Sequence, residues 1–160
     1  MKRITLLAMS MVLSTALNAD IKSYIGAGLG FMATPDTSGA ENGMGMTLQG
    51  GVRGFITDMP ETGARFELNK SLMGLNNGDA LTFATYITYD INIPNSQLAI
   101  RPKFGLIIPN ASDDVNSRDM TFSSGISGIF SLNEQIDLYV DYTVLGEFIT
   151  NYSIGAEFKF

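Results

Sequence analysis

The sequence predicts an all-β fold, an eight-stranded antiparallel up-and-down barrel that occupies residues 20–160. Eight segments alternate apolar and polar residues, which is the period of a strand with one apolar and one polar face. Turn-forming residues separate these segments, and no convincing helical period interrupts them. The number of segments is even, and each has about nine to thirteen residues, the length of a tilted strand that crosses a bilayer.

The N-terminus has the pattern of a secretory signal peptide. Lys2 and Arg3 precede the mostly apolar run Ile4–Leu13, and Leu17–Ala19 then resembles a signal-peptidase site. The alternative is a buried N-terminal helix. The run is too short for a comfortable membrane-spanning helix, and no cysteine follows it as a lipid attachment point. We therefore expect residues 1–19 to be a cleaved signal peptide.

Each predicted strand follows the previous one after a short connection. The fifth contains Pro102, which has no N–H for a sheet ladder, so we expect a bulge or irregularity there. The predicted strands are approximately Lys22–Met32, Met44–Ile56, Ala64–Leu72, Ala80–Ile91, Leu98–Ile108, Met120–Phe130, Ile136–Leu145 and Ile149–Phe160.

The connections alternate in length. If both termini lie in the periplasm, two of the outer loops are longer than any periplasmic turn, as is usual for membrane barrels. The periplasmic turns are then Thr57–Gly63, Ile93–Gln97 and Ser131–Gln135, and the outer loops are Ala33–Gly43, Met73–Asp79, Pro109–Asp119 and a tight turn near Gly146.

The charged residues decide which face of the barrel points inward. A soluble calyx with an apolar interior is the alternative, but eight strands enclose too little space for so many large apolar side chains. Charges turned toward lipid would cost about 2–4 kcal/mol for each Arg or Lys at the midplane. Among strand residues only Lys70 lies on the apolar face, at a height where it can reach lipid headgroups. The polar faces carry Arg53, Arg65, Glu67, Asp90, Arg101, Lys103, Asp137, Asp141, Glu157 and Lys159.

These ten residues comprise five cations and five anions, so the charges of the interior balance. Their positions along the strands place them in the periplasmic half of the barrel. Because buried charges must be paired, we expect a closed plug of ion pairs there. The outer half is expected to be lined by Thr47, Thr82, Ala84, Ser123, Gly125 and Thr143.

Composition excludes several function classes. The chain has no His, which removes the commonest general base, so we expect no enzyme, cofactor or metal site. The oxygen-rich loop around Asp113 and Asp114 is an alternative cation site, but a solvated acidic loop explains it better. Without Lys2 and Arg3, eight basic and sixteen acidic residues give a formal net charge of −8, which argues against nucleic acid as a partner.

The last nine residues of the chain alternate and end on an aromatic side chain. This ending resembles the C-terminal signature of Gram-negative outer-membrane β-barrels. The resemblance implies an assembly signal made of Tyr152, Ile154, Ala156, Phe158 and Phe160. Together with Tyr24–Gly30 and Pro102–Gly105, it makes residues 20–160 similar to the small OmpA/OmpX-like barrel family.

The resemblance implies an integral outer-membrane protein with both termini in the periplasm. Its expected partners are outer-membrane lipids, lipopolysaccharide and, during biogenesis, the barrel-assembly machinery, and we expect a monomer. A non-enzymatic structural or cell-surface role is the leading interpretation. The alternatives are a surface adhesin or immune-evasion protein that binds through its outer loops and, less favoured, a minor pore for small solutes.

Overall fold

The computed structural model describes residues 21–33, 42–56, 58–74, 81–110, 120–146 and 149–160. The expected signal peptide and most of the outer loops, including Asp113 and Asp114, lie outside these residues. All described strands belong to one antiparallel sheet, and none of the described residues forms a helix long and apolar enough to cross a membrane.

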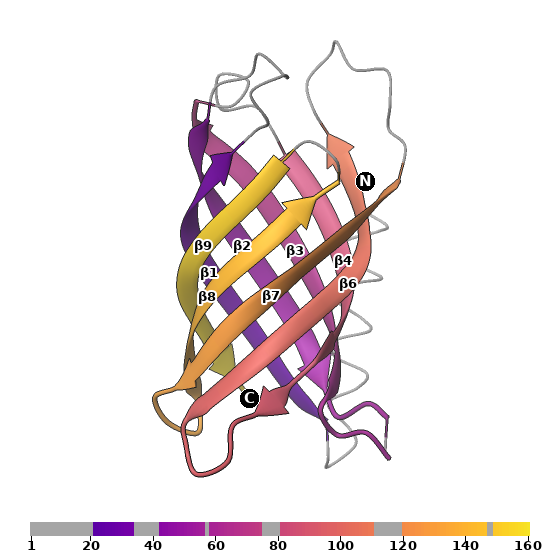
Figure 1. Ribbon diagram of the computed structural model, residues 1–160, viewed down its shortest axis with the longest axis vertical. Coiled ribbons are helices and arrows are strands. Elements are labelled where there is room, and N and C mark those ends of the chain that lie inside the picture. Colours follow the sequence, from indigo (N-terminus) through magenta and orange to yellow (C-terminus); the bar gives the residue numbers. More distant parts are fainter. Residues whose placement is uncertain (1–20, 34–41, 57, 75–80, 111–119, 147–148) are drawn as a thin grey trace.

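The sheet closes on itself, because β4 pairs with β6 in addition to its pairing with β3 (Figure 1). Consecutive strands pair throughout, and β1 pairs with the last strand, β9. The strands are β1 (Lys22–Ala33), β2 (Gly43–Arg53), β3 (Thr62–Met73), β4 (Leu81–Tyr89), β5 (Ile91–Asn92), β6 (Leu98–Asn110), β7 (Thr121–Ser131), β8 (Ile136–Leu145) and β9 (Ile149–Lys159). Because β5 continues the line of β4, the wall is an eight-stranded up-and-down barrel, as the sequence predicts.

Pro102 interrupts the ladder without a bulge. Thr88 pairs with Lys103 and Ile91 pairs with Ile100, so the register of β4 and β5 against β6 is the same on both sides of the interruption. The expected irregularity is therefore a missing backbone hydrogen bond, because Pro102 of β6 has no N–H to donate to the strand opposite it. Because this bond is missing, the strand that pairs with this part of β6 is divided into β4 and β5 at Asp90.

The strands are staggered around the wall. Following the paired residues from Met32 through β9, β8, β7, β6, β4, β3 and β2 leads back to β1 at Lys22, ten residues closer to the start of the strand. A stagger of this kind requires the strands to tilt by about 35–45° to the barrel axis. The tilt is visible in Figure 1. Side chains at one height in the interior therefore come from different rungs of the ladder.

Burial is inverted relative to a soluble barrel. Ile154 and Phe122 on the outside are 64% and 67% exposed, whereas Arg65 and Arg101 on the inside are 0% exposed. Alternation along each strand produces this arrangement, because successive side chains point to opposite faces of a sheet. Lys70 is exposed on the outer face of β3, as expected.

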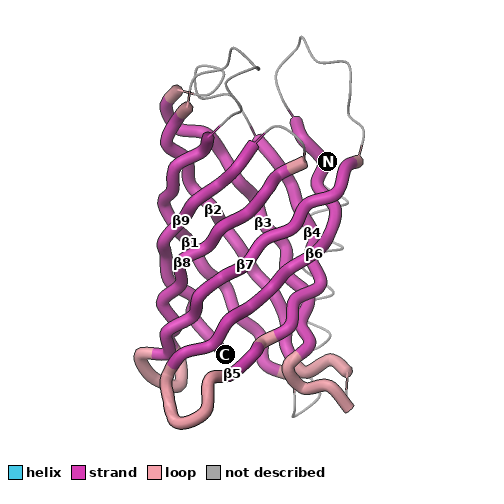
Figure 2. The backbone as a smooth tube through the Cα atoms, viewed as in Figure 1, coloured by secondary structure: helices cyan, strands magenta, loops and turns pink. Residues whose placement is uncertain are grey.

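The barrel has two unlike ends. At the terminal end, Lys22 and Phe160 lie beside the connections that include residues 54–56, 58–61, 93–97 and 132–135 (Figure 2). Phe160 and Ser23 exchange backbone hydrogen bonds of 2.9 and 3.1 Å, which ties the last residue to β1. The loop end is the opposite one, where β1, β3, β6 and β8 finish.

Candidate functional site: the barrel interior

The ten charged residues singled out in the sequence all lie in the barrel interior. Each takes part in at least one ion pair, and several of the pairs join strands that are not neighbours in the wall. No charge of the set is left alone. They come from β2, β3, β6, β8 and β9, and from Asp90 between β4 and β5.

Glu157 of β9 gathers several partners in the lower interior. Its Oε2 accepts a hydrogen bond from Arg53 Nη2 at 2.7 Å. Its Oε1 accepts from Arg101 Nη1 and from Gln49 Nε2, both at 2.8 Å. Arg65 Nη1 lies 4.0 Å from the same oxygen. Guanidinium groups from β2, β3 and β6 therefore converge on one fully buried carboxylate from β9.

Arg101 also holds Asp90 in a two-point contact. Nε donates to Oδ1 at 2.5 Å, and Nη2 donates to Oδ2 at 3.2 Å. A planar guanidinium suits this bidentate geometry. The contact lies beside Pro102, where the backbone ladder is interrupted, so a side-chain link spans the gap between β4 and β6.

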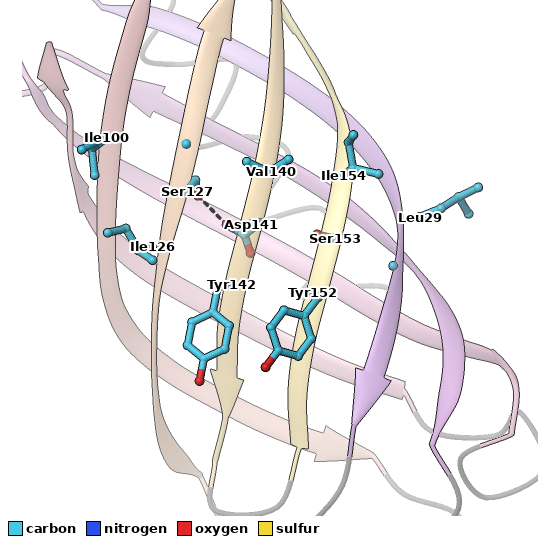
Figure 3. A pocket seen from close by; sticks show the side chains of 12 residues that line it. Leu29, Ile100, Ile126, Ser127, Val140, Asp141, Tyr142, Tyr152, Ser153 and Ile154 are labelled. Atoms are coloured by element: carbon cyan, nitrogen blue, oxygen red, sulfur yellow. Dashed lines mark hydrogen bonds between the residues drawn. The ribbon is translucent and has the colours of Figure 1, made fainter. Parts of the chain in front are cut away.

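A second group of charges lies nearer the middle of the barrel. Arg65 Nε is 2.6 Å from Glu67 Oε1, and Arg65 Nη1 donates to Ser127 Oγ at 3.3 Å. Lys103 Nζ bridges two carboxylates, at 2.5 Å from Glu67 Oε1 and 2.8 Å from Asp141 Oδ2. Ser127 also donates to Asp141, a bond visible in Figure 3. Four strands, β3, β6, β7 and β8, therefore contribute to this group, and Arg65 connects it to the Glu157 group.

The lowest pair closes the terminal end. Lys159 Nζ donates to Asp137 Oδ1 at 2.6 Å, and Ser131 Oγ donates to the same oxygen at 2.7 Å. Arg53 Nη1 lies 3.6 Å from Asp137 Oδ2 and so connects this pair to Glu157. Arg53 and Lys159 keep 16% and 17% of their side chains exposed, which marks the boundary with solvent.

Three tyrosine rings lie close to the cations of these ion pairs. Arg53 and Arg101 lie 4.8 and 5.3 Å from the centre of the Tyr24 ring. Arg65 lies 5.8 Å from the Tyr139 ring, and Lys103 Nζ lies 4.8 Å from the Tyr86 ring. Cations are attracted to the faces of aromatic rings. Alternation along β1, β4 and β8 assigns these tyrosines to the polar faces but does not indicate this contact.

Two of these rings fit because glycine lies opposite them. Tyr24 pairs across the strands with Gly51, and Tyr139 pairs with Gly155. A Cβ on Gly51 would lie 2.6 Å from the Tyr24 hydroxyl oxygen, and one on Gly155 would lie 2.5 Å from that of Tyr139. Such separations are too short for real side chains, so the glycines make room for the rings.

The interior closer to the loop end is neutral. Thr47 Oγ1 donates to Asn69 Oδ1 at 2.6 Å, and Asn151 Nδ2 lies 3.2 Å from the same oxygen. Thr82, Ala84, Ser123 and Thr143 are buried, as expected for this half. The structure adds four inward apolar side chains that the sequence reasoning missed: Met32, Ile107 and Leu145 in this half, and Ile129 of β7 nearer the terminal end.

The geometry of the interior favours a structural role, in which the ion pairs hold the wall together, over a catalytic one. The carboxylates are engaged with cations, and within the described residues no group of three or more Asp and Glu side chains could hold a metal ion. A general base or nucleophile needs a free partner at hydrogen-bond distance, which these paired groups do not offer. The ion pairs instead fill the interior and cross-link its strands.

The outer wall carries a shallow hollow of about 600 Å³ over β7, β8 and β9 (Figure 3). Ile126, Val140 and Ile154 line it together with Tyr142 and Tyr152, whose ring centres are 5.1 Å apart. The predicted assembly residues of β9 lie on this same outer face, where Tyr152, Ile154, Ala156, Phe158 and Phe160 are all exposed.

Comparison of the sequence with protein-family models and with curated proteins gives no match. The structure is similar to several solved barrels. A major outer membrane protein from Thermus thermophilus matches with a TM-score of 0.61 at 12% identity, over 88% of this chain and 99% of that one. Neisserial surface protein A matches with a TM-score of 0.55 at 11% identity, over 88% and 96%.

A third similar structure is Ail, the attachment invasion locus protein of Yersinia pestis, in complex with the heparin analogue sucrose octasulfate. Its TM-score is 0.55 at 13% identity, over 88% of this chain and 99% of that one. At these identities the similarity establishes the fold alone. The chain has the fold of the eight-stranded transmembrane β-barrels that are found among outer-membrane proteins.

Proposed function

We propose that this chain is a non-enzymatic integral protein of the bacterial outer membrane, with a structural or cell-surface role and a lumen closed by its ion-pair network. The inverted distribution of side chains carries the proposal. Apolar residues cover the outside of every strand, whereas five cations and five anions pair inside. Only a hydrocarbon surrounding makes that exterior favourable.

The closed lumen follows from the size of the barrel and from the pairing. Eight strands leave an interior just wide enough for its own side chains. Arg65 and Arg101 are the largest side chains that are fully buried, and both reach across to carboxylates on other strands. Opening a path for ions would require these pairs to separate in a space with little water, which is costly.

Orientation and partners belong to the same proposal. With the terminal end in the periplasm, Lys70 lies near the outer headgroups, and the long connections face outward. The outer wall would contact lipid and lipopolysaccharide, and the β9 face would serve as the signal for the assembly machinery. A role in surface binding remains the second candidate, and its loops lie mostly outside the described residues.

Two measurements test the proposal. Membrane-extracted protein should migrate differently on a gel before and after heating, as folded membrane barrels do; the absence of a shift contradicts the membrane barrel. In planar bilayers the protein should give no stable conductance. A large, ion-selective conductance contradicts the closed lumen and favours a pore.

A further inference from the structure

The interior contains an apolar group that the ion-pair network does not explain. Met32, Ile107 and Leu145 point inward and are 2%, 2% and 4% exposed. Ile149, which is partly buried, packs against Met32 and also against the cluster that contains Ile107 and Leu145. An apolar layer at one end of a mostly polar interior requires its own explanation. We call these four residues the apolar seal.

The apolar seal lies at the loop end. Leu145 is the last residue of β8, Ile149 is the first of β9, and Met32 is the last but one of β1. Ile107 lies three residues before the end of β6. The charged residues lie toward the opposite end of these strands, and the neutral layer of Thr47, Asn69 and Asn151 lies between.

Met32 extends the seal over the neighbouring strand β2. A Cβ on Gly45 of β2 would lie 2.7 Å from the Met32 Cε, so the thioether lies directly over this glycine. Glycine at position 45 therefore leaves the space that the methionine occupies. Methionine is unbranched and fills irregular gaps well. The seal thus reaches from β6, β8 and β9 through β1 to β2.

We propose that the apolar seal is a second barrier to ions, separate from the ion-pair network and placed on its loop side. Apolar constrictions block ions by excluding water, because an ion that enters must give up its hydration shell, which costs a large free energy. This inference rests on the proposed closed lumen, and it adds that loss of the ion-pair barrier alone does not open the barrel. The neutral layer between the two barriers is then shielded from both ends.

The competing explanation is ordinary packing, in which the four side chains stabilise the barrel without controlling access. The two explanations differ in what reaches the neutral layer. If the seal is a barrier, replacing it with small polar residues admits water-soluble reagents to Thr47, while the ion-pair network still stops ions from crossing. If it only packs, access to Thr47 stays unchanged.

The absence of cysteine from the sequence allows a clean reporter. Thr47→Cys places one thiol in the neutral layer, at a position that is 2% exposed. The seal variant carries Met32→Ser and Leu145→Ser. Its matched control carries Met44→Ser and Leu72→Ser, the same residue types on the outer wall, where the parent side chains are 49% and 47% exposed.

The reporter is labelled with a small, charged, thiol-specific reagent in folded protein that retains its heat-dependent gel shift. We expect no labelling in the parent or in the matched control, and labelling in the seal variant up to the level of a Glu134→Cys reference in an exposed turn. Equal labelling with and without the seal overturns the inference. If the serine pair does not fold, Met32→Ala with Leu145→Ala takes its place.

Conductance separates this inference from the proposed function. The double variant Arg65→Ser with Glu67→Ser removes one cation and one anion from the network, so the charge balance is preserved. We expect no stable conductance from the parent, the seal variant or this charge variant, and conductance from their combination. Conductance from the charge variant alone, or none from the combination, overturns the seal. Conductance from the parent or from the seal variant alone instead overturns the closure by ion pairs.

Discussion

Replacing Glu157 tests whether the ion pairs stabilise the barrel or only occupy it. In Glu157→Ala, Arg53 loses a partner at 2.7 Å and Arg101 loses one at 2.8 Å. The hydrogen bond from Gln49 is lost as well. Arg53 and Arg101 still reach Asp90, but the interior then holds one cation in excess.

The expected magnitude follows from burial. Glu157 has a side chain that is 0% exposed, and removing one partner of a buried pair typically costs about 3–5 kcal/mol. We expect the free energy of unfolding to fall within that range for Glu157→Ala. Glu157→Gln should lose less, because the amide oxygen still accepts hydrogen bonds from the guanidinium groups while the charge disappears.

The assay is urea unfolding of the refolded protein in lipid vesicles, with the heat-dependent gel shift reporting the folded fraction. Glu134→Ala is the matched control, because this glutamate lies exposed in the turn before β8 and should change stability by no more than about 0.5 kcal/mol. If Glu157→Ala loses no more stability than Glu134→Ala, the network does not hold the strands together and the reasoning is refuted.

Three further predictions address the wall. Gly28→Ala should destabilise the barrel by about 1–3 kcal/mol in the same assay, because its Cβ would overlap the Tyr139 hydroxyl oxygen, whereas Gly50→Ala, with its closest atom at 3.5 Å, should be nearly neutral; equal losses would contradict the overpacking argument. Ile126→Lys on the outer wall of β7 should lower the free energy of unfolding in vesicles by about 2–4 kcal/mol. Leu132→Lys, in the turn after β7, is the control. If Ile126→Lys lowers the free energy of unfolding by less than Leu132→Lys does, the outer wall does not lie in hydrocarbon. Phe160→Ala should reduce the amount of folded protein in cell membranes, but Phe122→Ala, also exposed on the outer wall, should not; if both variants assemble normally, the ending is no signal.

The alternation of side chains predicted the strands and the direction of each face, but not the contacts inside. Period two assigns Glu157 and Arg53 to the interior without saying that they meet, since 104 residues separate them. Their meeting depends on the stagger of the closed sheet, which is set by pairings all around the wall. For the same reason, the three tyrosine rings could be placed on the inner faces and not beside their cations.

The apolar seal was missed for a different reason, and the sequence did contain a signal for it. Met32 follows Phe31, Ile107 lies between Leu106 and Ile108, and Leu145 follows Val144. In a strand, adjacent residues must face opposite sides, so one residue of each apolar pair has to point inward. Reading these runs only as part of an apolar outer face ignores that requirement. Consecutive apolar residues near the same end of three strands therefore predict an apolar layer inside the barrel, which a strict count of alternation cannot show.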